Sequence, residues 1–368
     1  MSIEHLVFAG TYSEPIRFGT GQILEGKGKG IYSFRFDPKS GKLTPHGLTE
    51  NVRNPSYLCF DKDRRFLYSV NELKEFEGQF GGGMSAFRID QDTGALTFLN
   101  SKPTKGTDPC HIIVDKTGQF VFVANFASGS IIGYRIAADG SLGEEVAFVQ
   151  HEGSSVDPRR QTGPHSHAVE FDGTGRFAYV PELGLDKVMI YELDQKTGAV
   201  KPASQPWVSV APGAGPRQLV MHPKGRFAYL INELNSTMTA YGYDSKTGAL
   251  TELQTLSTLP AGFTGATSCA EVQITPDGKF LYGSNRGHNS LVIYAVDPDK
   301  GTLTVVGHES TRGAIPRNFE IDPTGRFVIV ANQDSDNLVP FALDPATGKL
   351  AAIGEIATCP TPICVRFV

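Results

Sequence analysis

The chain has 368 residues, of which 40% are hydrophobic and 20% charged, and its formal net charge at pH 7 is −5. This composition is typical of a globular protein, and the lack of a basic excess argues against a general nucleic-acid binder. Five scattered cysteines form no CxxC pair, and we find neither a signal-peptide pattern nor a membrane span, so we expect a cytoplasmic protein.

Two short patterns recur along the chain. The first is a strand, a turn and a second strand that begins with phenylalanine, repeated every 47 to 57 residues at Phe66, Phe120, Phe177, Phe227, Phe280 and Phe327. The second is a hairpin turn of the type DPKSGKL, found at residues 37–43, 90–96, 137–142, 194–200, 244–250, 297–303 and 344–350. These turns predict seven structural repeats.

Each repeat holds four predicted strands. In the repeat that starts at Pro216 they cover residues 217–222, 226–233, 238–244 and 250–256. Four-stranded units at this period are typical of a β-propeller, and no helical periodicity competes with them. We therefore predict an all-β protein, a seven-bladed β-propeller with four antiparallel strands per blade, forming a single domain over residues 1–368.

The two ends of the chain predict how the ring closes. Residues 5–11 match the second strand of a repeat, and residues 30–37 match the third. Residues 361–368 match a first strand. We expect the C-terminal strand to join the N-terminal blade, because this pairing leaves no open sheet edge.

Two glycine-rich insertions, residues 14–30 and 73–83, separate the second and third strands of their blades. Loops of this length are either functional or flexible. Both insertions could cover the mouth of the central channel, or they could be surface loops without a role in the site.

Polar residues that differ between blades occur where the innermost strand begins and where the second strand ends. The innermost position holds Ser56, Cys110, His167, Arg217, Ala270, Arg317 and Ile363; the second-strand position holds Thr11, Glu72, Phe126, Glu182, Glu233, Arg286 and Gln333. Both positions should face one rim of the channel. Arginine, glutamate and histidine side chains from neighbouring blades predict an anion-binding site with acid–base chemistry.

The stretch GPHSHAVEFD, residues 163–172, places His165 and His167 on one face of a predicted strand, because strand side chains alternate. The two histidines either belong to the site or only satisfy loop carbonyl groups. A metal pair is a third possibility. No further histidine or carboxylate stands at ligand spacing, so we expect no metal.

Other residues at this rim could have a structural role instead of a role in the site. Arg217 and Arg317 could bridge neighbouring blades through Glu182 or Glu233. The asparagines that end the second strands, Asn71, Asn125, Asn232, Asn285 and Asn332, are expected to hydrogen-bond turns. Glu271 follows the innermost position by one residue, and alternation predicts that it faces away.

Five segments resemble the seven-bladed propeller lactonase family. They are residues 213–241, 164–172 and 270–287, the opening GTY…GIYSFRFDPKSGKL and the final PTPICVRFV. This family includes propeller-type 6-phosphogluconolactonases and the carboxy-cis,cis-muconate cyclase. The resemblance spans essentially the whole chain and implies a metal-independent active site without a cofactor. It implies catalytic roles for His167, Arg217, Glu233 and Arg286; our alignment adds His165, Glu182, Arg317 and Gln333 as substrate-binding candidates.

The resemblance implies hydrolysis of a lactone, with 6-phospho-D-glucono-1,5-lactone as the expected substrate. Arg217 or Arg286 would stabilise the oxyanion, and His167, or Glu233 acting through it, would activate water. The other arginines would bind the substrate anion. Two alternatives remain, a lactone-forming cyclase and a propeller that only binds a partner. We expect a monomer or weak homo-oligomer that binds a small anionic lactone and neither nucleic acid nor a membrane.

Overall fold

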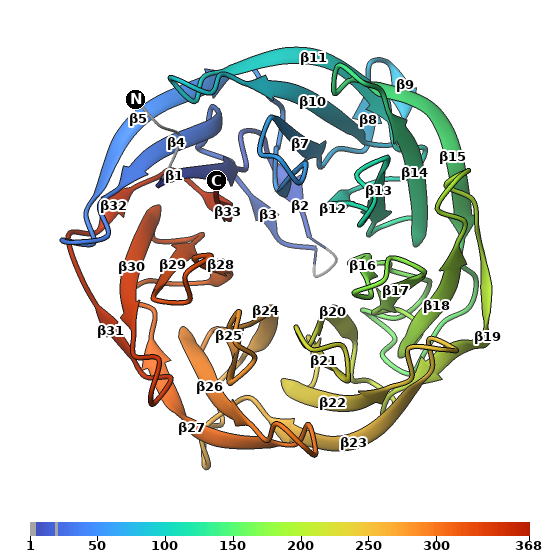
Figure 1. The fold of residues 1–368 in the computed structure, drawn as a ribbon, viewed down its shortest axis with the longest axis vertical. Coiled ribbons are helices and arrows are strands. Elements are labelled where there is room, and N and C mark those ends of the chain that lie inside the picture. Colours follow the sequence, from blue (N-terminus) through green and yellow to red (C-terminus); the bar gives the residue numbers. More distant parts are fainter. Residues whose placement is uncertain (1–4, 19–20) are drawn as a thin grey trace.

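A computed structural model describes residues 5–18 and 21–368, which form seven β-sheets arranged as blades around one ring (Figure 1). Six of the sheets have four strands, and the seventh has a short additional strand on its outer side. All the strand pairings are antiparallel. These findings confirm the predicted seven-bladed propeller. The described residues contain no helix that is long and apolar enough to cross a membrane.

Every blade is ordered from an innermost strand at the channel to an outermost strand at the edge of the ring. From the inside outwards, blade 1 contains β33 (Pro362–Phe367), β1 (Leu6–Thr11), β4 (Gly30–Phe36) and β5 (Leu43–Glu50). Blade 2 contains β6 (Leu58–Phe60), β7 (Phe66–Asn71), β10 (Gly83–Ile89) and β11 (Leu96–Pro103). Blade 3 contains β12 (Pro109–Val114), β13 (Phe120–Asn125), β14 (Ser130–Ile136) and β15 (Leu142–Gln150). Blade 4 contains β16 (Glu170–Phe171), β17 (Phe177–Glu182), β18 (Lys187–Leu193) and β19 (Val200–Ser209).

The remaining blades follow the same order. Blade 5 contains β20 (Pro216–Met221), β21 (Phe227–Asn232), β22 (Thr237–Tyr243) and β23 (Leu250–Ser257). Blade 6 contains β24 (Ser268–Ile274), β25 (Phe280–Arg286), β26 (Ser290–Val296) and β27 (Leu303–Ser310). Blade 7 contains β28 (Pro316–Ile321), β29 (Phe327–Asn332), β30 (Asn337–Leu343) and β31 (Leu350–Ala352), and β32 (Ala357–Thr358) also pairs with β30.

The ring closes through the two ends of the chain. β33 pairs with β1, so that Val365 lies opposite Ala9. Both residues are fully buried, in a cluster that also contains Ile329 of blade 7. The predicted closure is therefore confirmed. β1 is paired along both of its edges, because the C-terminal strand β33 supplies the innermost strand of blade 1.

The two recurring sequence patterns contact each other across blades. Gly301, in the outer hairpin turn of blade 6, has a φ of 70°, a conformation that favours glycine. Its carbonyl oxygen accepts a hydrogen bond from the Tyr229 hydroxyl of blade 5 at 3.2 Å. A Cβ atom at Gly301 would lie 2.3 Å from the ring of Phe227. The same arrangement recurs at Gly140, Gly248 and Gly348.

The two insertions differ in position. The first contains the hairpin of β2 (Ile16–Arg17) and β3 (Ile23–Leu24), which extends over the centre of the ring (Figure 1). Phe18 and Leu24 pack against a buried cluster of Tyr12, Ile16 and Ile363. The second contains the hairpin of β8 (Glu75–Phe76) and β9 (Gln79–Phe80), where Phe80 is 76% exposed. Residues 19–20 of the first insertion lie outside the described residues.

Candidate active site

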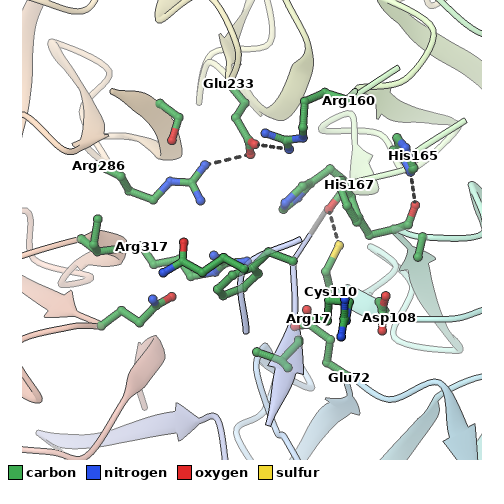
Figure 2. Close-up of a pocket in the computed structure, with 18 of the residues that line it drawn as sticks. Arg17, Glu72, Asp108, Cys110, Arg160, His165, His167, Glu233, Arg286 and Arg317 are labelled. Carbon is green, nitrogen blue, oxygen red and sulfur yellow. Dashed lines mark hydrogen bonds and ion pairs between the residues drawn. The ribbon is translucent and has the colours of Figure 1, made fainter. Parts of the chain in front are cut away.

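A cavity of about 530 Å³ lies at the end of the channel where the innermost strands begin. Its wall includes most of the predicted site residues, namely His165, His167, Glu233, Arg286, Arg317 and Gln333. The first insertion contributes Ile16, Arg17 and Phe18, so it does cover the channel mouth. Figure 2 shows that the labelled charged side chains surround a common space.

Glu233, which directly follows β21, is contacted by three guanidinium groups. Its Oε1 accepts a hydrogen bond from Nη2 of Arg160 at 2.7 Å. Its Oε2 lies 3.0 Å from Nε of Arg217 and 2.9 Å from Nη2 of Arg286. Burial by itself would raise the pKa of Glu233, but the charges of Arg286, Arg160 and Arg217 together outweigh burial and hold this pKa well below its usual value.

These contacts hold Glu233 as an ionised carboxylate among three arginines. The polar contacts of this carboxylate within the described residues go to arginines. The structure therefore does not pair Glu233 with His167. Its contacts instead fix the positions of Arg160 and Arg286 at the cavity wall (Figure 2).

Arg217 lies below the cavity, in a narrow section of the channel that it shares with His167, Cys110 and Arg317. Its side chain is 5% exposed, and it donates hydrogen bonds to Glu233 and to the carbonyl oxygen of Ala270. The ion pair with Glu233 lies within blade 5, and the hydrogen bond to Ala270 reaches blade 6, so the ion pair does not bridge blades as the structural alternative expects. Arg217 lines this narrow section and does not line the larger cavity.

Arg286 and Arg317 present donors to the cavity. Arg286 donates from Nη2 to the carbonyl oxygen of Cys269 at 2.7 Å, but its buried Nε has no partner among the described residues. Burial lowers the pKa of Arg286 to about 10, so it is still protonated at neutral pH. Arg317 makes no hydrogen bond or ion pair within residues 5–18 and 21–368. Its guanidinium lies 5.7 Å from the ring centre of Tyr12 and 5.1 Å from that of Phe18.

The two predicted histidines have different surroundings. His165 stacks on the ring of Phe126, and its Nδ1 lies 3.0 Å from the Phe126 carbonyl oxygen. His167 is 7% exposed, and its Nδ1 has no partner in the described part of the chain. Burial and the positive charge of Arg217 keep the pKa of His167 well below its usual value. His167 is therefore a neutral imidazole at neutral pH, whereas His165 satisfies a loop carbonyl group.

Two other predicted residues differ in their distance from the site. Gln333 lines the cavity and donates to Asp334 Oδ1 at 2.7 Å. The structure does not bring Glu182 into the cavity. Glu182 is fully buried, and its Oε2 lies 2.7 Å from Nδ1 of His151 and 2.6 Å from Oγ of Ser166. This separate cluster secures the segment that carries the two histidines, because Oε1 of Glu182 accepts the backbone N–H of His165. That segment precedes β16, so the two histidines lie outside the strand that was predicted for them.

Glu271 lies with the residues that follow the innermost position by one in other blades. It accepts hydrogen bonds from two of them, Gln218 at 2.6 Å and Asn318. It lines the narrow section of the channel and also a separate pocket with Tyr57, His111 and Gln218. The pairing of β24 with β25 is irregular between Cys269 and Val272, and β12, β20 and β28 begin with a similar irregularity.

Sequence reasoning assigned no role to three residues at this site, although it placed Glu72 at the rim. Glu72 lines the cavity and the narrow section, and burial raises its pKa to about 7. The hydroxyl of Tyr12 lies 3.0 Å from each of its carboxyl oxygens. Glu72 stands at the same strand-end position as Glu233, which was a signal for it. Arg160 reaches the site from a long loop, for which the repeat alignment offers no counterpart.

The expected asparagine contacts are present. The side-chain amide of Asn285 donates to the Thr258 carbonyl oxygen at 2.8 Å, and that of Asn332 donates to the Thr311 carbonyl oxygen at 2.9 Å. No group of three or more His, Cys, Asp or Glu side chains that could hold a metal ion occurs in the part of the chain that the structure describes.

Known proteins with a similar sequence or structure bear on the function of this site. A model of the family described as "Lactonase, 7-bladed beta-propeller" matches residues 6–367. The 6-phosphogluconolactonase of Bacillus subtilis (strain 168) is 36% identical over 81% of this chain and 83% of its own length. That of Formosa agariphila is 34% identical over 79% of this chain and 82% of its own length. The solved structure of the periplasmic gluconolactonase of Pseudomonas aeruginosa is 36% identical, with a TM-score of 0.90 and coverage of 99% of this chain and 98% of the other.

The fold, the residues of the site and these relatives all point to the same family. The ring has seven blades, its channel mouth gathers arginine, glutamate and histidine side chains, and the family match covers nearly the whole chain. The chain belongs to the seven-bladed β-propeller lactonase family, and it is a lactone hydrolase.

Proposed function

We propose that the enzyme hydrolyses 6-phospho-D-glucono-1,5-lactone to 6-phosphogluconate. The observation that carries this proposal is the guanidinium of Arg317, which makes no hydrogen bond or ion pair with the described residues and lies at the wall of a cavity that also holds Arg160 and Arg286. Guanidinium groups bind phosphate oxygens in a bidentate manner. A phosphorylated sugar lactone would supply the anion that Arg317 lacks, and the relatives from Bacillus subtilis and Formosa agariphila are named 6-phosphogluconolactonase.

The same geometry supports a route for the reaction. The lactone carbonyl would lie beside Arg286, whose guanidinium lines the cavity and can donate a hydrogen bond to the oxygen as it becomes negative. The neutral His167 would accept a proton from the attacking water. The new bond joins the water oxygen to the carbonyl carbon, and the bond from that carbon to the ring oxygen breaks. Glu233 takes part indirectly, because it holds Arg286 and Arg160 in place.

A second candidate substrate is the unphosphorylated glucono-1,5-lactone. The relative from Pseudomonas aeruginosa is described as a periplasmic gluconolactonase and is as similar in sequence as the relative from Bacillus subtilis. The two substrates differ in the phosphate group only. The side chain that we assign to this group, Arg317, therefore provides the test.

We expect kcat/KM of the wild type to be higher for the phosphorylated lactone. Substitution Arg317→Met should lower this value about 10- to 100-fold, because charge-assisted hydrogen bonds contribute about 1.5–3 kcal/mol. It should change kcat/KM for glucono-1,5-lactone much less.

Arg312→Met is the matched control, because Arg312 is exposed and pairs only with Glu309 among the described residues. Preference of the wild type for the unphosphorylated lactone, or equal losses for both lactones, would contradict the phosphate assignment. Lactone formation from a carboxymuconate by the wild type would instead support the cyclase alternative.

We further propose that the enzyme acts in the cytoplasm. All five cysteines are free thiols, four of them buried, which suits a reducing compartment. Cell fractionation with an antibody would test this assignment, and recovery of the enzyme outside the cytoplasm would overturn it.

A further inference from the structure

We propose that Glu72 is the general acid of the reaction, which protonates the ring oxygen as the lactone opens, and that Tyr12 positions its carboxyl group. This inference rests on the lactone hydrolysis proposed above. It assigns to Glu72 the proton that the leaving oxygen requires, for which Glu233 is unsuited.

The position of Glu72 fits this role. It directly follows β7 and is 6% exposed, at the wall of both the cavity and the narrow section. Figure 2 shows Glu72 and Glu233 at opposite sides of the cavity, with His167 and Arg317 between them. A lactone bound between the two glutamates would thus lie next to His167, the proposed base for the attacking water, and would have Glu72 within reach of its ring oxygen.

The contacts of Glu72 keep its carboxyl group available for proton transfer. Glu233 has three guanidinium partners, but Glu72 has no ion pair within the described residues. Its hydrogen-bond partner is the Tyr12 hydroxyl, which has one proton to donate to two carboxyl oxygens.

The charges around Glu72 balance so that its carboxyl group titrates near neutrality. Burial raises the pKa of Glu72 to about 7, and the charge of Arg317 opposes this increase. The titratable and charged groups that face Glu72, or share its part of the cavity, are Tyr12, Arg317, Asp108, Cys110, Arg17 and Lys74.

The proton balance of the reaction is complete with these groups. Water gives one proton to His167 as its oxygen bonds to the carbonyl carbon. When the bond from this carbon to the ring oxygen breaks, the electron pair goes to the ring oxygen, which takes the proton of Glu72 and becomes a hydroxyl. The proton on His167 then returns to Glu72 through solvent, so the net reaction is lactone plus water to hydroxy acid. Groups whose environments separate their pKa values in this way form a typical acid–base pair.

A general acid must be protonated, so kcat should fall as the pH rises through about 7. Glu72→Gln should lower kcat about 100-fold or more below this pH and abolish the fall, since general acid catalysis contributes about 10²–10⁴-fold. Tyr12→Phe removes a donor that stabilises the ionised carboxylate, so the fall should move to higher pH. A purely structural role of Tyr12 would not move it.

The measurement is the pH profile of kcat, corrected for spontaneous hydrolysis, with both 6-phosphoglucono- and glucono-1,5-lactone. The unphosphorylated lactone has no titrating group, so a fall seen with both substrates belongs to the enzyme. Glu320→Gln is the control, because Glu320 is another partly buried carboxylate but pairs with Arg366 and lines neither the cavity nor the narrow section. This variant should keep the fall near pH 7.

The outcomes separate the two proposals. If the folded wild type hydrolyses neither lactone, the proposed function fails and the role of Glu72 fails with it. If the wild type is active and a folded Glu72→Gln variant keeps both the rate and the fall, only the role of Glu72 is overturned. Thermal unfolding of each variant establishes that it is folded.

Discussion

Glu72 and Glu233 occupy equivalent positions at the ends of second strands, but their surroundings give them different protonation states. Three guanidinium groups keep Glu233 ionised. Burial raises the pKa of Glu72 to about 7, although its hydrogen bond with Tyr12 opposes this increase. Chemistry in this ring therefore depends on which residues the neighbouring blades supply. The same side chain is an anchor in one blade and a proposed acid in another.

Substitution Glu233→Gln should lower the free energy of unfolding at pH 7 by about 3 kcal/mol or more, because buried arginines lose their counter-charge. The folded-state pKa of Glu233 is depressed, so the stability from its charge is present above the unfolded pKa of about 4.3 and is lost as the pH falls towards the folded pKa. The difference between variant and wild type should therefore shrink below about pH 4.3.

Denaturant unfolding at several pH values measures this difference. Glu309→Gln removes one partner of an exposed ion pair with Arg312 and should cost less than about 1 kcal/mol. A difference for Glu233→Gln that stays constant with pH would contradict the assignment of an ionised, arginine-bound carboxylate.

Repeat alignment predicted much of the cavity wall from the sequence. It placed His167, Glu233 and Arg286 together because each stands at a repeat position that faces the channel mouth. It also placed Glu182 there, but a buried histidine from a preceding loop holds that carboxylate in a separate cluster. Contacts of this kind join segments that follow no repeat, so the pattern contains no information about them.

At the level of the elements, each hairpin turn is held by the blade before it. The tight contact of the Gly301 turn with Phe227 and Tyr229 of blade 5 explains why the glycine turn and the strand-opening phenylalanine recur together. The strand pattern was predictable because its period is regular. The irregular pairing near the start of β12, β20 and β24 was not, since a period of strands and turns does not specify an extra residue within one strand.

Gly301→Ala should be strongly destabilising. Its φ of 70° strains any residue with a Cβ, and that atom would lie 2.3 Å from the Phe227 ring. Left-handed strain alone costs about 1–3 kcal/mol, and the clash adds to it. Gly225→Ala is the matched control, because Gly225 has a φ of 64° but no atom within 4 Å of the position that its Cβ would occupy.

The two variants are compared by their unfolding free energies. The loss for Gly301→Ala should exceed that for Gly225→Ala, and the excess measures the contact between blades. Equal losses would show that the turn does not depend on its neighbour.

At the scale of the whole molecule, the ring is closed by a strand that joins the two ends of the chain. β33 covers β1 from Val7, which lies opposite Phe367, to Thr11, which lies opposite Pro362. The sequence predicted this closure because the first and last segments match different strands of one repeat. A cavity built from several blades depends on it, because opening the ring would separate those blades.

A chain that ends at Thr361 should fail to form a stable monomer, because β1 would become an exposed hydrophobic edge. We expect aggregation, or loss of the cooperative unfolding transition, in calorimetry and size-exclusion chromatography. Removal of Val368 alone is the control and should leave the transition in place. A monomeric, cooperatively folded chain without β33 would contradict the role of strand closure.

The most direct test of the proposed activity is the initial rate at which the wild type hydrolyses freshly generated 6-phospho-D-glucono-1,5-lactone, coupled to a dehydrogenase that consumes the product. We predict a rate that is proportional to enzyme concentration and far above that of spontaneous hydrolysis. A rate equal to spontaneous hydrolysis, from folded enzyme, would contradict the assignment of this cavity to the phosphorylated lactone.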